Sequence, residues 1–366
     1  MNNMSEDYLS IAPLKMSLTI DSNEVIMLMA GSGEISIDWG DGTREPYSLL
    51  KPVFNIKCRR GSEHYIDWRV DKEMRLKYGF FHNYKNRSVY TITIKGENIT
   101  HLRCEHNQLT ELDVSNNSAL IYLVCHSNRL RKLDVNNNRE LIVLNCYVNQ
   151  LEKLDLGNNT KLIALDCNDN KLTGLDVSKN IALTKLDCSN NLLTDLDVSC
   201  NTELNALYCW ENQITSLDLS KNVKLTVLTC IKNQLTKLEL SKNTALTKLY
   251  CANNPLKSFD VRNNPDIEQI YYFFPKDLEI IQNYLHELII KRSEECHSYT
   301  LLKNLPKITD ETLIRQEKYP IKDIDGEFKY QLTDREGKPV LLVESSAKNL
   351  KSQRHEINSN GVSLVQ

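Results

Sequence analysis

The side chains best suited to acid–base or metal chemistry lie between residues 101 and 126. His101, Glu105, His106 and His126 fall in this one stretch, and imidazole and carboxylate groups together can transfer protons or hold a metal ion. The sequence contains no H-E-x-x-H motif, nucleophile elbow or phosphate-binding loop. We therefore interpret the four as scattered surface residues. We expect no catalytic residue, no bound metal and no cofactor.

Cysteine thiols are the second candidate for chemistry, because the chain has eleven of them. Eight recur at a constant step of 21 residues: Cys104, Cys125, Cys146, Cys167, Cys188, Cys209, Cys230 and Cys251. Neighbouring parallel strands in register hold such thiols in a poor geometry for a disulfide, and no C-x-x-C sequence supports a zinc site. Buried thiols behave as small hydrophobic groups, so we predict an inward-pointing cysteine ladder.

Carboxylates form a third periodic set: Asp113, Asp134, Asp155, Asp176, Asp197, Asp218, Glu239 and Asp260. The glycine-rich nonapeptide of calcium-binding β-rolls is missing from the sequence. We favour structural carboxylates that accept hydrogen bonds from nearby backbone or Ser/Thr groups, with a calcium ridge as the alternative.

The elements that position these side chains follow from the same period. Each period reads L-x-x-L-x-C-x-x-N-x-L, as in residues 120–130. A fixed period of 20–30 residues predicts a solenoid. The pattern resembles the leucine-rich repeat, including bacterial internalin-like repeats, with cysteine in place of one consensus leucine. The resemblance implies a solenoid of parallel strands over residues 97–274, in about nine coils, that binds a protein or peptide along its repeat face.

Alternation of side chains predicts how each coil is built. Leu123 and Cys125 point inward from a short strand, and Asn128 then turns the chain with its amide bonded to backbone groups of its own and neighbouring coils. Leu133 and Val135 alternate in the same way. We therefore also predict a second short strand on the opposite flank of each coil.

The N-terminal part differs in composition from the repeats. We expect a flexible tail at residues 1–14 and a β-sandwich at residues 15–96. The run Asp38-Trp39-Gly40-Asp41-Gly42-Thr43 is similar to that of polycystic-kidney-disease-type (PKD-like) domains, although the stretch from Thr43 to His82 is longer. That resemblance implies a core tryptophan and a tight turn. We expect this domain to cap the open end of the solenoid, and Asp38 and Asp41 to stabilise the turn, with calcium binding as the alternative.

The C-terminal part resembles no family that we recognise. We predict an α+β segment over residues 275–343, with a helix from Asp277 to about Lys291 and a hairpin formed by residues 327–332 and 340–343. Residues 344–366 are polar, and we expect them to be disordered. The fold class expected for the whole chain is mainly β.

Outward positions of the repeat strands vary from coil to coil, as a recognition surface does. The residues that we predict to bind a partner are Tyr208, Trp210, Ile231, Tyr250, Tyr271, Phe273, Asp166 and Asp187. The aromatic members would contact an apolar partner surface, unless the C-terminal segment covers Tyr271 and Phe273 as core. The two aspartates would select a basic partner, although an ordinary solvated face explains them equally well.

The functional hypothesis is a non-enzymatic, monomeric scaffold for a protein or peptide ligand. The net charge of −3 gives no basic surplus for nucleic acid, and no apolar run is long enough for membrane insertion. The first residues lack a secretory signal, so we expect a cytoplasmic protein. One alternative is a surface or secreted adhesin that binds host protein or glycan, if the true start lies upstream. A second alternative is an enzyme whose activity lies in residues 276–366.

Overall fold

The computed structural model describes residues 14–19, 24–51, 77–86, 88–96, 98–256, 258–261, 263–267 and 269–272, and, beyond these, six short strands. The chain divides into two compact units, Met1–Leu193 and Thr194–Gln366. Each unit contains part of the 21-residue repeat. The domain boundaries expected near residues 96 and 274 stay predictions.

The first unit begins with eight strands that form antiparallel sheets. They are β1 (Leu14–Thr19), β2 (Glu24–Gly31), β3 (Gly33–Asp38), β4 (Arg44–Leu49), β5 (Gly79–Asn83), β6 (Val89–Gly96), β7 (Ile99–Arg103) and β8 (Leu109–Asp113). One sheet has the order β4-β3-β6-β1-β8, and in the other β2 lies between β5 and β7. Since β7 and β8 belong to the first repeat, the repeat is joined to both N-terminal sheets, and its edges are paired rather than exposed.

The turn between β3 and β4 has the geometry that its sequence predicts. Trp39 is completely buried, and its backbone carbonyl accepts a 2.7 Å hydrogen bond from the Tyr84 hydroxyl. Gly40 and Gly42 have φ values of 81° and 94°, which only glycine adopts without strain. The tryptophan is therefore a core anchor, and the two glycines make the tight turn.

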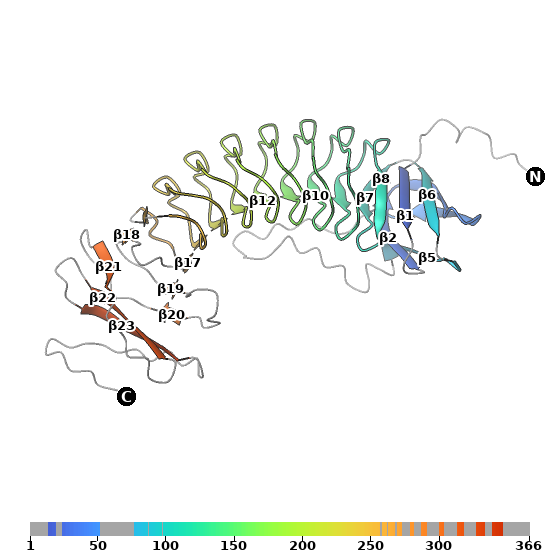
Figure 1. Ribbon diagram of the computed structural model, residues 1–366. Coiled ribbons are helices and arrows are strands. Elements are labelled where there is room, and N and C mark those ends of the chain that lie inside the picture. The colour runs from blue at the N-terminus through green and yellow to red at the C-terminus, as the bar shows by residue number, and fades with distance from the viewer. Residues whose placement is uncertain are drawn as a thin grey trace, which may run out of the picture. The chain divides into compact units, whose positions relative to one another are not determined.

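Parallel coils follow in the first unit. Their strands are β9 (Tyr122–Val124), β10 (Val143–Asn145), β11 (Ala164–Asp166) and β12 (Lys185–Asp187). β7 pairs in parallel with β9, which continues the register from the first repeat. The strands lie along one side of the coils and the turns along the other (Figure 1). The strand side is therefore one continuous parallel sheet.

The second unit continues the repeat with β13 (Ala206–Tyr208), β14 (Val227–Thr229) and β15 (Lys248–Tyr250), followed by β16 (Ser258–Asp260) and β17 (Gln269–Tyr272). β13, β14, β15 and β17 pair in parallel, in that order. Across the described residues, seven regular three-residue strands, β9–β15, recur at the 21-residue step. The repeat region is thus a parallel β-solenoid, as predicted.

The prediction of a C-terminal helix is wrong. Residues 277–291 contain β18 (Glu279–Ile281) and β19 (Glu287–Ile290), each ending in isoleucine-rich sequence that favours strand over helix. The later strands are β20 (Thr300–Lys303), β21 (Leu313–Glu317), β22 (Glu327–Thr333) and β23 (Pro339–Ser346). β22 and β23 pair antiparallel at the position predicted for the hairpin. The tail expected at 344–366 lies outside the described residues from 347 onward.

The prediction of a second strand on the opposite flank is also wrong for the regular coils. Leu133 and Val135 are buried as expected, but residues 130–136 form no strand. Side-chain amides form hydrogen bonds to the backbone carbonyl groups that a second strand ladder would pair. Asn138 donates through Nδ2 to the backbone oxygens of Val114 and Asn117, at 2.9 and 2.7 Å. Coils are therefore linked on this flank by asparagine rather than by strand pairing.

The predicted asparagine ladder on the strand side is confirmed. Asn149 donates through Nδ2 to the carbonyl oxygens of Cys125 and Cys146, at 3.0 and 3.1 Å, and its Oδ1 accepts from Leu130 N at 3.0 Å. Equivalent bonds to cysteine carbonyls are made by Asn128, Asn170, Asn191, Asn233 and Asn254. Each side chain thus satisfies backbone groups of two adjacent coils, which would otherwise be buried without partners.

The cysteine ladder is confirmed as core. All eight thiols at the 21-residue step are fully buried and free, whereas Cys200 is exposed. Burial raises the pKa of the Cys104 thiol far above its ordinary value, so the thiol stays protonated and unreactive. Cys58 and Cys296 lie outside the described residues.

One residue in each coil has a left-handed backbone, immediately before the ladder asparagine. In the regular coils this residue is Ser127, Val148, Asp169, Asn190, Glu211, Lys232 or Asn253. Val148, at φ 50°, is the only β-branched residue of this set, and its side chain is largely exposed. A β-branched side chain is strained in this conformation, whereas asparagine tolerates it.

We therefore predict that Val148→Asn stabilises the protein, by about 1 kcal/mol, because it relieves backbone strain without removing a buried contact. Denaturant unfolding measures the change. Val223→Asn is the matched control, since Val223 is also exposed but has no left-handed backbone. The control should change the free energy of unfolding by less than about 0.5 kcal/mol. Equal effects of the two substitutions would contradict this explanation.

Candidate binding face

The candidate site is the strand face. We define it as the outward side chains at three positions of each coil: the first and third residues of strands β9–β15, and the residue two positions after the end of each strand. The register places these side chains in columns. In the first unit one column contains Val124, Asn145, Asp166 and Asp187, and in the second unit the same column contains Tyr208, Thr229 and Tyr250. The predicted columns are thus confirmed within each unit.

In the first unit most of the strand face is buried, whereas Tyr147, Asn168 and Lys185 are partly exposed. Tyr122, Val124, Val143 and Ala164 form one hydrophobic cluster, with exposures between 0% and 8%. Asp166 and Asp187 are only 2% and 6% exposed. The interpretation of these two aspartates as a solvated face is therefore wrong.

The electrostatics of the two buried aspartates follow from their neighbours. They lie directly opposite each other on β11 and β12. Burial raises the pKa of both carboxyl groups. The negative charge of Asp187 raises the pKa of Asp166 further. Asp187 Oδ1 accepts a hydrogen bond from Ser189 N at 3.1 Å, and Asp166 Oδ1 accepts one from Asn168 Nδ2 at 2.6 Å. Both carboxyl groups are therefore shifted towards the neutral, protonated form.

The histidines near the first coils are not scattered surface residues, so that prediction needs correction. His101 and His126 are buried, and His106 is exposed. The His126 ring stacks on Tyr147 at a centroid distance of 4.1 Å, and the His101 ring stacks on Tyr122 at 5.6 Å. Burial lowers the pKa of both histidines to about 4. Each is an aromatic packing residue in the neutral form, a role that their column positions beside tyrosines could have suggested.

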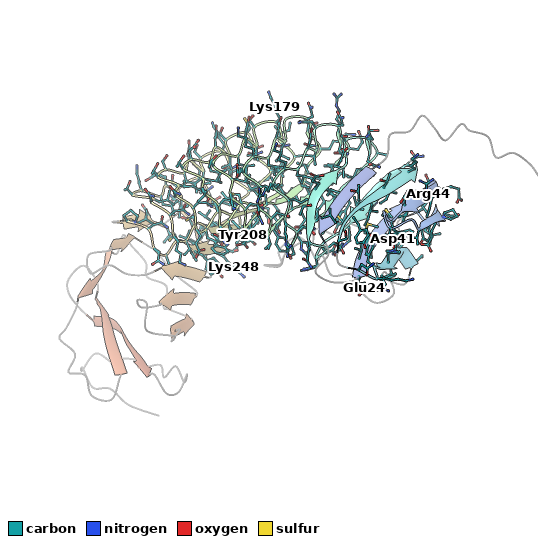
Figure 2. All side chains as sticks on the ribbon, turned by 45° about the vertical axis from the view of Figure 1, so that its right-hand side comes forward. Glu24, Asp41, Arg44, Lys179, Tyr208 and Lys248 are labelled. Carbon is teal, nitrogen blue, oxygen red and sulfur yellow. The ribbon has the colours of Figure 1, made fainter. Side chains whose placement is uncertain are left out.

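In the second unit the strand face is more open. Tyr208, Trp210, Ile231 and Tyr250 are all partly exposed, as are Thr229 and Val227. Tyr208 and Lys248 come from the strands of this face (Figure 2). Tyr271 lies opposite Tyr250 in the strand register, although only its backbone is described. Phe273 lies outside the described residues. Four of the predicted aromatic and aliphatic contact residues thus belong to one accessible surface.

The periodic carboxylates serve the turns, as predicted. Asp113, Asp134, Asp155, Asp176, Asp197 and Asp218 each accept a hydrogen bond from the backbone N–H two residues later. Asp38 accepts from Gly40 N and pairs with Arg44, and Asp41 accepts from Thr43 N and contacts His82, at 2.8 Å (Figure 2). Burial opposes ionisation of Asp41, but the bonds from Thr43 and His82 outweigh it and lower its pKa to about 2.

Among the described residues, no group of three or more histidine, cysteine or acidic side chains has an arrangement that could hold a metal ion. The described part of the chain likewise contains no helix of the length and apolar character needed to cross a membrane. What the geometry offers is a row of partly exposed aromatic side chains on a regular scaffold. Such an arrangement suits recognition of another molecule.

No protein-family model matches the chain, and no curated protein sequence matches it. Among solved structures, the functional domain of InlJ from Listeria monocytogenes, which includes a cysteine ladder, is 45% identical over 48% of this chain and 39% of its own, with a TM-score of 0.48. The leucine-rich effector YopM from Yersinia pestis is 27% identical over 52% of this chain and 53% of its own, with a TM-score of 0.43.

A third structure, the leucine-rich repeat protein LIC12759 from Leptospira interrogans, is 21% identical over 45% of this chain and 46% of its own, with a TM-score of 0.42. This chain therefore spans between two fifths and just over half of these proteins. Its own repeats, buried cysteine ladder and parallel strands form a β-solenoid that resembles the leucine-rich repeat fold. The chain is similar to InlJ over about half of its own length.

The buried histidines predict a pH dependence of stability. Because the pKa values of His101 and His126 fall from 6.5 to about 4 on folding, the unfolded chain binds more protons than the folded chain between these pH values. The stability that they contribute is present above pH 6.5 and is lost as the pH falls towards 4. Asp166 and Asp187 have raised pKa values in the folded protein, so they act in the opposite sense. Their contribution to the stability of the fold decreases as the pH rises above the pKa of the same groups in the unfolded chain.

We expect His126→Gln to reduce the loss of unfolding free energy between pH 6.5 and pH 4.5 by about 1–2 kcal/mol relative to the unsubstituted protein. Urea unfolding at a series of pH values measures this slope. His106→Gln removes an exposed imidazole beside the His126 ring and should change the slope much less than His126→Gln does, because burial is the main cause of the lowered pKa of His126. An unchanged slope in His126→Gln would show that the buried imidazole does not control the pH response.

Proposed function

We propose that this protein is a non-enzymatic scaffold that binds an extended protein or peptide segment on the strand face of its second unit. The observation that carries the proposal is the row of partly exposed Tyr208, Trp210, Ile231 and Tyr250 on regularly spaced parallel strands. Exposed tyrosine and tryptophan are the residues most often found as binding hot spots. The leucine-rich repeat fold supports the same reading, because its invariant core leaves the strand face free to vary.

The rigidity of this face supports binding of an extended ligand. Behind Tyr208 and Tyr250, the inward residues Leu207 and Leu249 are fully buried, and each strand is bonded to its neighbours. Lys232 pairs with Glu211 across adjacent coils beside the face. A backbone already fixed by the scaffold loses little further entropy when a ligand binds.

We propose a supporting role for the N-terminal sheets. The buried Trp39 supports a PKD-like character for these sheets, and β1 and β2 pair with β8 and β7 of the first repeat. The sheets would therefore serve as the cap that a solenoid needs at an open end. We further propose that the protein acts as a monomer and in the cytoplasm.

The binding proposal predicts the behaviour of a Tyr208→Ala/Trp210→Ala double variant. Peptides selected from a displayed random library with the unsubstituted protein should bind this variant at least about 30-fold more weakly, as expected for the loss of a hot-spot side chain. Calorimetric titration of the selected peptides measures the dissociation constants. Unfolding curves of the variant establish that its stability is unchanged.

An Ile181→Ala/Val223→Ala double variant is the matched control. These two apolar side chains are strongly exposed but follow the turn asparagines Asn180 and Asn222 rather than the strands. The control should bind the selected peptides with unchanged affinity. Equal affinity of the aromatic double variant, or failure of the library to yield any binder, would contradict binding at this face.

A further inference from the structure

Side-chain size alternates along the strand face of the second unit. In the column formed by the third positions of β13, β14 and β15, the residues are Tyr208, Thr229 and Tyr250, and all three are partly exposed. The strands pair in register, so these side chains follow one another at the strand spacing of about 4.8 Å. The two tyrosines are therefore about 9.6 Å apart, with a short hydroxyl side chain between them.

The spacing of the two tyrosines distinguishes between the conformations that a bound peptide could have. A polyproline II helix advances about 3.1 Å per residue with three residues per turn, so its side chains recur on one face about every 9.3 Å. An extended β-strand repeats on one face about every 6.7 Å, and two turns of an α-helix measure about 10.8 Å. The polyproline II repeat differs from the tyrosine spacing by about 0.3 Å, and the helical repeat by about 1.2 Å. The column therefore fits a polyproline II segment best.

The chemistry of the face suits the same conformation. Proline-rich segments dock on surfaces lined by aromatic rings, because the preformed polyproline II helix loses little entropy on binding. Trp210 lies two residues after Tyr208 on the same coil and is partly exposed, and its indole N–H is a hydrogen-bond donor. The backbone carbonyls of a polyproline II helix have no partner within the helix. Trp210 can therefore contact a proline ring and donate to a carbonyl of the same segment.

The charge of the face favours an acidic residue beside the prolines. In the coils of β13, β14 and β15 the charged outward residue is Lys248, and the others are Ala206, Tyr208, Trp210, Val227, Thr229, Ile231, Tyr250 and Ala252. Beside the face, Glu211 and Lys232 pair with each other and add little net charge. Because Lys248 lies two residues before Tyr250 on β15, a carboxylate next to the proline at Tyr250 would meet a positive potential.

We propose that the strand face of β13–β15 binds a polyproline II segment of a partner protein, with an acidic residue beside the prolines. The segment crosses the strands, with one proline against Tyr208 and Trp210 and the proline three residues further on against Tyr250. The acidic residue pairs with Lys248. This inference rests on the proposed function, because it specifies the ligand of the same face.

Calorimetric titration of the full chain with a synthetic peptide tests the inference. The peptide contains about nine prolines, which form roughly three turns, and two aspartates at each end. We expect it to bind at least about tenfold more tightly than a glycine–serine peptide of equal length with the same ends. Equal binding of the two peptides would overturn the proposal.

A substitution between the two tyrosines tests the spacing itself. Thr229→Tyr replaces a repeat of about 9.6 Å by one of about 4.8 Å and should weaken binding of the proline peptide at least about tenfold. The fold should tolerate this change, since tyrosine already occupies the same column in both neighbouring coils. Thr236→Tyr, at an exposed position outside the strand face, is the matched control and should leave the affinity unchanged. Unchanged affinity in Thr229→Tyr would contradict recognition by spacing.

Charge reversal and peptide selection complete the test. Lys248→Glu should weaken binding of the aspartate-flanked proline peptide and strengthen binding of a lysine-flanked one, each at least about fivefold, and no change in either would overturn the charge pairing. Peptides selected from the displayed library should carry prolines three residues apart. Selected peptides that depend on Tyr208 and Trp210 but lack this spacing would overturn the inference and leave the proposed function intact, whereas a library that yields no binder would overturn both.

Discussion

The hydrogen bonds from asparagine side chains to the backbone of adjacent coils are the constraint on which this structure depends. In the regular coils, one flank has no pairing between strands. Asn149 and its equivalents satisfy the backbone on the strand side, and Asn138 and Asn159 do so on the other flank. Because an amide both donates and accepts, asparagine can bridge coils where aspartate or leucine could not.

Because these bonds and the interior residues hold the coils together, the outward residues of the strand face can vary without loss of the fold. Leucine and cysteine fill the interior of every coil, and the strand face is free to differ between the two units. In the first unit the face carries buried apolar and acidic side chains, and in the second it carries partly exposed aromatic ones. The same repeat thus presents different side chains on the strand face of its two units.

The features predictable from the sequence are those set by local, repeated chemistry. The period identified the solenoid, and the column positions of Tyr208 and Asp166 followed from strand alternation. The burial of Asp166, Asp187 and His126 was not predictable, because strand alternation only places their side chains on the outward face of the coils. The helix predicted for residues 277–291 failed for another reason, since short apolar runs fit both the helical and the strand period.

The most direct test of the central claim compares two neighbouring asparagines. Asn159 is fully buried and donates to the carbonyl oxygens of Val135 and Asn138, both at 2.9 Å, whereas Asn158 is exposed. Asn159→Ala should lower the free energy of unfolding by about 2–4 kcal/mol, because it leaves two buried carbonyls unpaired, and Asn158→Ala should change it by less than about 0.5 kcal/mol. Equal small effects at both positions would contradict the dependence of the solenoid on its asparagine bonds.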